Sequence, residues 1–359
     1  MSTRGTRKRA RTGSVAAASN DGATPEPGNA AAGSRKRDEE FWYEDGNIIL
    51  VARDIEFRVF RGILAKHSPV FRDMFSLPQP PTISSTTSSS EQDTCPVVHL
   101  SDSPEDLRHV LRAYMPTGGP IAFFHKDPPY SYHAISAAVR LGHKYQMSDL
   151  LDNALRYLKM YYPTDFDKWI VLDEYGPPGF DEPRSYAIGV VNLARLTGET
   201  GLLLMALLVC CTIPEASDLI RGFEREDGSR EQLSLDDIAL CVDAKSTLAE
   251  LSVKMMLGIC RQVVSSACET MQGCSHAFKY VLTELENEAN ILHSDPSVDI
   301  LALEAVLEDA DLCLHCQAMV KERKIRERKA AWGQLEEIFA IDLPVDNEEG
   351  QAAGNAVHP

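Results

Sequence analysis

The sequence lacks a long apolar run. Its longest stretch of this kind, Gly201 to Ile213, is shorter than the ~20 residues that a membrane-spanning helix needs, so it predicts a buried helix instead. The start of the chain also lacks the leucine-rich core of a secretory signal, because its first apolar residues are alanines among Ser, Gly and Pro. These two absences indicate an intracellular protein with no membrane partner.

Motifs for catalysis are absent as well. The chain has no nucleophile elbow, no motif that pairs a cysteine with a base, no phosphate-binding glycine loop and no dinucleotide fingerprint. We therefore expect a protein that is not an enzyme, with no catalytic and no cofactor-binding residues. The alternative is a catalytic set whose members meet only in the fold, which a single sequence does not reveal.

Positive charge is scarce outside one short region. The formal net charge is −17, yet residues 1–37 hold eight Lys or Arg against two Asp or Glu, a balance of +6 that leaves −23 for the remainder. An acidic body repels phosphate backbones, so nucleic acid is not an expected partner. The basic run from Lys321 to Lys329 has no interleaved aromatics and is interpreted as a solvated helix face, with nucleic-acid binding as the alternative.

Residues 1–38 are predicted to be a disordered basic tail, because their Ser, Ala, Gly, Pro and basic residues bury too little apolar surface to offset the entropy of ordering. Two basic clusters in it, Lys8 to Arg11 and Arg35 to Arg37, fit either a nuclear-import signal or a tail that only aids solubility. The expected localisation is the nucleus or the cytoplasm, and the clusters favour the nucleus.

The stretch from Glu44 to Leu77 has the clearest local pattern in the chain. Ile48 to Val51 is a β-branched and aliphatic run, and Glu56 to Val59 alternates polar and apolar residues. Ala52 to Asp54 between them can form a tight connection, which predicts a β-hairpin. The apolar spacing then changes to three and four residues, which predicts helices after the hairpin.

Two short helices are expected to meet at Ser68 and Pro69, because Ser68 fits an N-cap and Pro69 the first helical position. The pattern F-x-V-x-R-x-I-L-A-x-x-S-P-V-F-R-x-M-F, which runs from Phe57 to Phe75, resembles the opening of the BTB/POZ domain, a protein-interaction fold. Among BTB proteins, the whole arrangement is most similar to the large set found in mushroom-type (basidiomycete) fungi.

The resemblance covers residues 39–160 and is interrupted by a low-complexity loop at residues 78–94. It implies a small three-stranded sheet flanked by helical hairpins, and a partner-binding surface in place of an active site. It also implies self-association as a homodimer.

Two positions depart from BTB domains that recruit transcriptional corepressors. Those domains commonly carry an Asp early in the first strand and a His or other basic residue before a conserved Arg or Lys, where this chain has Asn47, and Phe60 ahead of Arg61. The resemblance places these three residues, together with Leu111 and Tyr114, in the protein-interaction surface. The alternative for Phe60 is an aromatic at the edge of the core.

The second half of the chain is predicted to be helical. Asp173 to Pro183 is rich in Gly, Pro and acidic residues, so a linker is placed at residues 161–183. Helical periodicity continues through residues 184–342 with no strand pattern, and residues 343–359 are expected to be a disordered tail. The predicted fold class is α+β, with the BTB/POZ domain followed by an all-α domain.

Nine cysteines in a chain without a secretory signal are expected to be thiols or metal ligands rather than disulfides. Cys268 and Cys274, with the pair Cys313 and Cys316, supply the four sulfurs that a structural zinc needs. The first pair is widely spaced, so it is expected to converge only if Gly273 breaks a helix. Cys241 and Cys260 are reserve ligands. The alternative is that every cysteine is a small buried hydrophobe.

These observations favour a non-enzymatic adaptor that acts through its BTB/POZ domain. One alternative is a substrate adaptor of a cullin-RING ubiquitin ligase, in which residues 111–116 and the helices after Tyr132 would face the cullin. The other is a nuclear transcriptional regulator, which would draw on the basic tail. Structural zinc is the only cofactor that the sequence suggests.

Overall fold

The computed structural model describes residues 35–77, 95–115, 129–172, 174–287, 293–298 and 301–344. The loop predicted at residues 78–94 and nearly all of the two predicted tails lie outside these ranges. Among the described residues, no helix is both long enough and apolar enough to cross a membrane.

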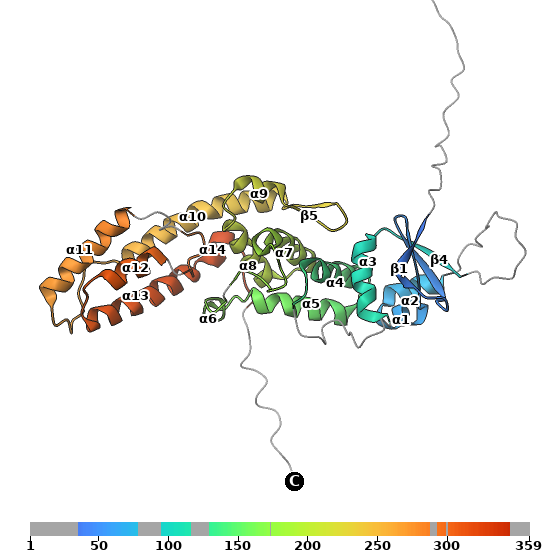
Figure 1. Ribbon diagram of the computed structural model, residues 1–359, viewed down its shortest axis with the longest axis horizontal. Coiled ribbons are helices and arrows are strands. Elements are labelled where there is room, and N and C mark those ends of the chain that lie inside the picture. The colour runs from blue at the N-terminus through green and yellow to red at the C-terminus, as the bar shows by residue number, and fades with distance from the viewer. Residues whose placement is uncertain are drawn as a thin grey trace, which may run out of the picture. The chain divides into compact units, whose positions relative to one another are not determined.

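The hairpin predicted from the alternating pattern is present, and two further strands flank it (Figure 1). Strand β2 pairs antiparallel with β3, and their connection turns at Arg53, whose φ of 51° lies in the left-handed region. The sheet order is β1-β3-β2-β4, with β4 parallel to β2. The strand bounds are β1 Lys36–Trp42, β2 Ile48–Ala52, β3 Ile55–Val59 and β4 Val97–Leu100.

The expected three-stranded sheet is therefore a four-stranded one, because β1 lies in a stretch that was predicted to be disordered up to residue 38. Strand β1 runs parallel to β3 and contributes a fully buried Phe41. The carboxylate of the buried Asp38 accepts hydrogen bonds from the backbone amide of Phe41 and from Arg108 Nε, at 2.9 and 2.6 Å. Charge pairing rather than hydrophobic alternation stabilises this strand, so its sequence lacks a strand pattern.

Helices α1 (Arg61–His67) and α2 (Pro69–Ser76) meet as predicted. The Ser68 hydroxyl accepts a hydrogen bond from the amide of Phe71 at 3.0 Å, which caps α2. It also donates to the backbone oxygen of Tyr145 at 2.6 Å, so the cap ties α2 to the end of α4.

Four further helices continue this part of the chain: α3 Pro104–Tyr114, α4 Tyr132–Lys144, α5 Ser148–Tyr161 and α6 Phe166–Trp169. The last of them falls inside the expected linker, residues 161–183. Trp169 and Phe180 in that stretch are each 4% exposed and belong to the main core. The stretch is packed rather than extended, because its aromatics outweigh its Gly and Pro content in deciding its structure.

The C-terminal half is helical as predicted, and the apolar run from Gly201 to Ile213 is largely buried in it. Gly198, with φ 74°, ends α7 in the left-handed conformation that glycine adopts readily, and α8 returns against α7. The bounds are α7 Pro183–Thr197, α8 Thr200–Cys211, α9 Ala216–Arg221, α10 Leu235–Ile259, α11 Met271–Asn287, α12 Leu301–Asp309, α13 Leu314–Trp332 and α14 Leu335–Phe339.

The expectation that this half contains no strands is wrong. A two-stranded hairpin, β5 (Phe223–Glu224) with β6 (Arg230–Glu231), precedes α10. Its turn holds Asp227 and Gly228, a dipeptide typical of hairpins, and Gly228 has the positive φ of 75° that such a turn needs. The strands are only two residues long, which is too short for alternation to appear in the sequence.

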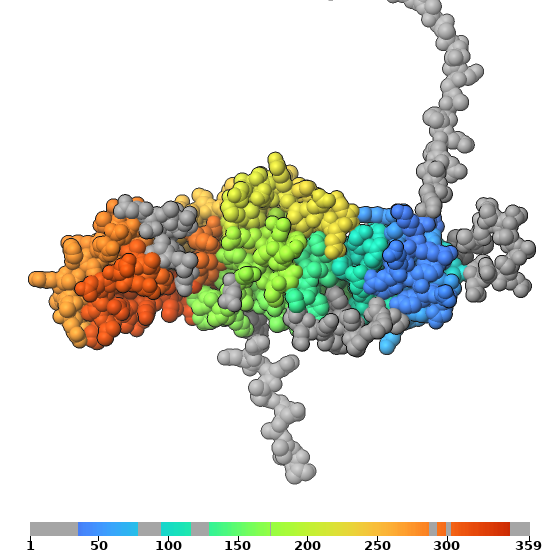
Figure 2. All heavy atoms as spheres, in the orientation of Figure 1, coloured from blue at the N-terminus to red at the C-terminus, as the bar shows by residue number. Residues whose placement is uncertain are grey.

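This hairpin lies directly against α3 and α4 (Figure 2). Arg225 bonds the carboxylate of Asp106 on α3, and the buried Glu231 accepts from Arg140 on α4 at 2.8 and 2.9 Å. At the turn, Asp227 accepts from Arg53 of the sheet at 2.6 Å. The hairpin therefore joins the two halves of the chain with charged pairs.

The division between hydrophobic cores falls inside α10 and not in the expected linker. One cluster extends from Phe41 in β1 to Ile341 and includes Leu248 of α10. The second begins at Leu251 of the same helix and joins it to α11, α12 and α13. Helix α10 packs beside α13 (Figure 1), so a single helix carries side chains of both cores.

Candidate functional site

Four cysteines from separate parts of the second core meet at one point. Cys268 lies in the loop between α10 and α11, and Cys274 lies in the first turn of α11. Cys313 is the N-cap of α13, and Cys316 lies in its first turn. Their four Sγ atoms all lie within 4.8 Å of one another. The cluster that the sequence predicted is therefore assembled, and it can hold a metal ion.

Cys268 and Cys274 converge because α11 begins between them, and not because the helix breaks at Gly273, which is helical. The helix begins at Met271, so Cys268 approaches from the preceding loop while Cys274 points from the helix itself. The expected helix break at Gly273 is wrong, because a helix boundary shortly before it gives the same convergence.

Hydrogen-bond donors surround the sulfurs. The backbone amide of Cys313 donates to Cys274 Sγ at 3.3 Å, and the amide of Ser265 donates to Cys316 Sγ at 3.4 Å. The loop before α11 is in turn fastened to α13, because Arg323 donates to the carbonyl oxygens of Arg261 and Val263 at 3.0 and 2.8 Å. Sequence reasoning missed this support, since main-chain donors and the reach of Arg323 have no local sequence signal.

The thiols differ in acidity. Backbone amides of Cys316 and Glu269 lower the pKa of the Cys313 thiol to about 6, because they favour its thiolate. Burial raises the pKa of Cys316 to about 12, and burial also raises that of Cys268. One thiolate ligand is thus ready at neutral pH, and a bound cation would favour the thiolate form of the others.

The two reserve ligands lie elsewhere. Cys241 packs in the first core, where Cys211 Sγ lies 3.6 Å from its carbonyl oxygen, and Cys260 is buried at the end of α10. Neither belongs to the cluster. His315, which stands between two of the four cysteines in the sequence, pairs with Glu269 at 3.4 Å instead.

A second candidate surface lies where the hairpin meets α1. The side-chain oxygen of Asn47 accepts a hydrogen bond from the amide of Arg61 at 2.8 Å. The N-cap position of α1 is occupied by Phe60, whose side chain cannot accept a hydrogen bond, so Asn47 caps the helix from the neighbouring loop. The hydrogen-bond acceptor at position 47 therefore stabilises the start of α1.

Phe60 and Arg61 have different surroundings. The half-buried ring of Phe60 lies 4.9 Å from that of Tyr43, centroid to centroid, and the two form an aromatic pair at the surface. The guanidinium of Arg61 donates to the carbonyl oxygen of Phe75 at 2.6 Å, which fastens α1 to the end of α2. We call the exposed Asn47 and Arg61 together with Tyr43 and Phe60 the hairpin–α1 surface.

The two residues expected on α3 do not join this surface. Leu111 is 0% exposed, so its assignment to a partner-binding surface is wrong; it faces inward on the amphipathic helix. Tyr114 is partly buried with its ring 4.6 Å from that of His67, and burial raises the pKa of its hydroxyl to about 12.

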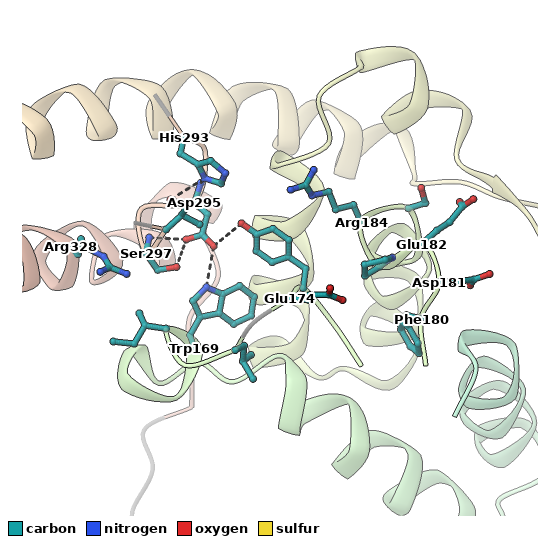
Figure 3. Close-up of a pocket in the computed structure, with 16 residues that line it drawn as sticks. Trp169, Glu174, Phe180, Asp181, Glu182, Arg184, His293, Asp295, Ser297 and Arg328 are labelled. Atoms are coloured by element: carbon teal, nitrogen blue, oxygen red, sulfur yellow. Dashed lines mark hydrogen bonds between the residues drawn. The ribbon is translucent and has the colours of Figure 1, made fainter. Parts of the chain in front are cut away.

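A cavity of about 860 Å³ lies between the stretch around Trp169 and the loop of residues 293–298 (Figure 3). At its wall, the buried carboxylate of Asp295 accepts from Trp169 Nε1 at 3.1 Å and from the Tyr175 hydroxyl at 3.3 Å. It also accepts from the amide and the hydroxyl of Ser297, at 2.8 and 2.6 Å. Both oxygens of the carboxylate accept hydrogen bonds from these four donors. Asp295 therefore connects separate segments of the chain and is not assigned a role as an acid or base.

Residues 43–161, from the end of β1 to the end of α5, match the model of the BTB/POZ domain. No curated protein matches the chain. The resemblance to BTB proteins of mushroom-type fungi stays a prediction. The hairpin, the capped helix pair and α3 to α5 all lie within the matched range, so the chain contains a BTB/POZ domain, a protein–protein interaction module, followed by a helical region.

Proposed function

We propose that this protein is a non-enzymatic adaptor whose BTB/POZ domain pairs with another copy of the chain. The match of residues 43–161 to an interaction module carries this proposal. The fixed placement of the helical region supports it, because a shared core and the β5–β6 hairpin join that region to the BTB/POZ domain. Such an adaptor holds whatever its helical region binds at a defined position relative to its partner.

The hairpin–α1 surface is the proposed contact between copies. Tyr43 and Phe60 offer adjoining rings, and rigid aromatic side chains are typical anchors of protein interfaces. Asn47 and Arg61 use polar groups to hold α1 in place, so the surface is preorganised. Only one of its four residues, Arg61, is charged, which suits an isologous contact with a second copy.

Light scattering coupled to size exclusion tests the self-association. A mass near twice 39.7 kDa is expected for the natural chain. Phe60→Asp should give the monomer mass, because it places an unpaired charge in the contact. Tyr280→Asp on α11, where the residue is 41% exposed, is the matched control and should stay dimeric. A monomer for the natural chain at tens of micromolar would refute self-association.

The role of cullin adaptor is the second candidate, and a contact through α4 does not fit the structure. Nine residues of α4 are buried, and α7 packs on this helix. A cullin would have to bind another face of the domain. Affinity purification that recovers a cullin with the natural chain, and loses it with Phe60→Asp, would support this role through the hairpin–α1 surface.

We also propose that Cys268, Cys274, Cys313 and Cys316 bind one structural zinc ion. Four sulfurs around a tetrahedral zinc at about 2.3 Å are spaced about 3.8 Å apart. The Sγ atoms of Cys268 and Cys313 lie 3.8 Å apart, and all four fall within 4.8 Å. Amide donors to Cys274 and Cys316 would further stabilise the thiolates. Four thiolates leave no open coordination position, which assigns the metal a structural role.

Metal analysis of the purified protein tests this site. About one equivalent of zinc is expected, and Cys274→Ser should lower it strongly, since it removes a buried ligand. Cys95→Ser is the matched control, because Cys95 lies before β4 and outside the cluster. Less than about a tenth of an equivalent after gentle purification would exclude the metal and leave the cluster as buried thiols.

A further inference from the structure

We propose that the solvent-facing side of α10 is a docking site for an amphipathic helix with a basic flank, supplied by a partner protein. Four large apolar side chains on this helix are exposed: Leu235 by 83%, Val242 by 54%, Val253 by 41% and Leu257 by 62%. At 100° per residue, their spacings of seven, eleven and four place all four within about 40° of one line along the helix. We call them the α10 stripe.

The stripe is not the face by which α10 packs on its own chain. Cys241, Leu248, Met255 and Ile259 point to the opposite side, and they are buried in the two cores. An ordinary surface helix is apolar on one side only, so a second apolar line facing solvent indicates a binding surface. From Leu235 to Leu257 the stripe extends over about 33 Å, the length of six turns.

The charged residues on one flank of the stripe indicate which kind of helix can bind there. Asp236, Asp243 and Glu250 recur every seven residues along the same side of α10, and all three are exposed. None of these carboxylates has an ion-pair partner among the described residues. Lys254 lies on this flank too, so the flank carries three negative charges against one positive charge.

The net negative charge of this flank favours a partner whose facing residues are positively charged. A partner helix that covers the stripe with apolar side chains would place its own flank beside the three carboxylates. Lys or Arg residues on that flank would be attracted, and acidic ones would be repelled. The occupant is therefore an amphipathic helix whose polar residues next to its apolar face are basic.

A second copy of this chain fits the stripe poorly. In a two-fold antiparallel pair of helices, each flank faces the same flank of the other copy. Asp243 and Glu250 would then stand against the acidic residues of that flank, and like charges at such a contact cost free energy that one lysine per copy offsets only in part. The stripe is therefore assigned to a different protein and is separate from the self-association through Phe60.

A binding titration tests the assignment. The probe is a fluorescein-labelled synthetic helix of three heptads, with leucine at positions a and d and lysine at positions e and g, measured by anisotropy at about 0.15 M salt. A second peptide carries glutamate in place of every lysine. The natural chain is expected to bind the lysine peptide at least about tenfold more tightly than the glutamate peptide.

Paired variants separate specific docking from general attraction to an acidic protein. Val242→Gln with Leu257→Gln should weaken binding of the lysine peptide about tenfold or more, while helix propensity is retained. Leu314→Gln with Ile325→Gln on α13 removes comparably exposed apolar groups, 79% and 52%, and should leave binding unchanged.

A charge reversal on the flank tests the sign of the partner. Asp243→Lys with Glu250→Lys turns the flank from net negative to net positive, and it should reverse the preference between the two peptides. Both positions are exposed in the middle of α10, and lysine favours helix, so the fold should be kept. Circular dichroism verifies that each variant is folded.

Three outcomes would overturn the proposal. They are no binding by the natural chain, equal binding by the α10 and α13 variants, or a change of oligomeric mass in the α10 variant, which would make the stripe a self-association surface. Phe60→Asp should bind the lysine peptide as the natural chain does. Failure of self-association is thus distinguishable from failure of this proposal.

Discussion

Arg225 Nη2 lies 2.8 and 2.6 Å from the two carboxylate oxygens of Asp106, a residue 119 positions earlier in the chain. The two side chains are only 14% and 13% exposed. Arg225 belongs to the β5–β6 hairpin and Asp106 to the first turn of α3, so this pair joins the helical region to the BTB/POZ domain.

Removing one member of this pair should strongly destabilise the protein. Arg225→Ala leaves the carboxylate of Asp106 largely buried and unpaired, and we expect the free energy of unfolding to fall by about 3 kcal/mol. Arg112→Ala breaks the pair with Glu40, whose side chains are 42% and 37% exposed, and should cost less than about 1 kcal/mol. Urea denaturation measures both variants. Equal losses would show that the hairpin contact contributes no more than a surface ion pair.

Asn47 should be replaceable by a residue of the same shape that accepts a hydrogen bond, such as Asp, but not by the smaller Ala. Asn47→Ala removes the hydrogen bond to the amide of Arg61 and should lower the free energy of unfolding by about 1 kcal/mol. Asn47→Asp keeps an acceptor at the positive end of α1 and should be neutral or slightly stabilising. Thermal unfolding is measured together with the oligomeric mass of both variants, because loss of the cap alone lowers stability and leaves the mass unchanged, whereas loss of a partner contact changes the mass as well.

Gly189 on α7 should resist substitution because of its contact with the BTB/POZ domain. A Cβ at this position would overlap the phenol of Tyr132, which is 1% exposed on α4. Gly189→Ala is expected to destabilise the fold by about 2 kcal/mol through overpacking, although alanine favours helix. Gly62→Ala on α1 meets no atom within 4 Å and should stabilise by about 0.5 kcal/mol. The comparison is made by denaturant unfolding, and two stabilising results would contradict the close packing of α7 on α4.

Metal removal should loosen only the second core. A chelator is expected to speed amide exchange in the first turns of α11 and α13, which lie at the cysteine cluster. Strands β2 and β3 of the BTB/POZ domain belong to the other core and should keep their protection. Hydrogen exchange with mass spectrometry locates the change. Uniform loosening of the chain would show that the two cores unfold as one.

The sequence by itself determined the local features whose signals lie within a few residues. Ser68 and Pro69 predicted the meeting of α1 and α2, because capping depends on neighbouring residues. The hairpin of β2 and β3 followed from alternation, and the BTB/POZ domain from a motif that runs from β3 through α1 and α2. The four cysteines could be named as a set, since their residue type limits the chemistry they can support.

Only the tertiary structure decided how these parts are joined. Strand β1 depends on Arg108 of α3, which pairs with Asp38 in the strand. The β5–β6 hairpin depends on partners that are 91 and 119 residues away in the sequence. The division between cores lies within α10, where no change in composition marks it. Long-range charge pairs and packing have no periodicity along the chain, so the sequence alone could not place them.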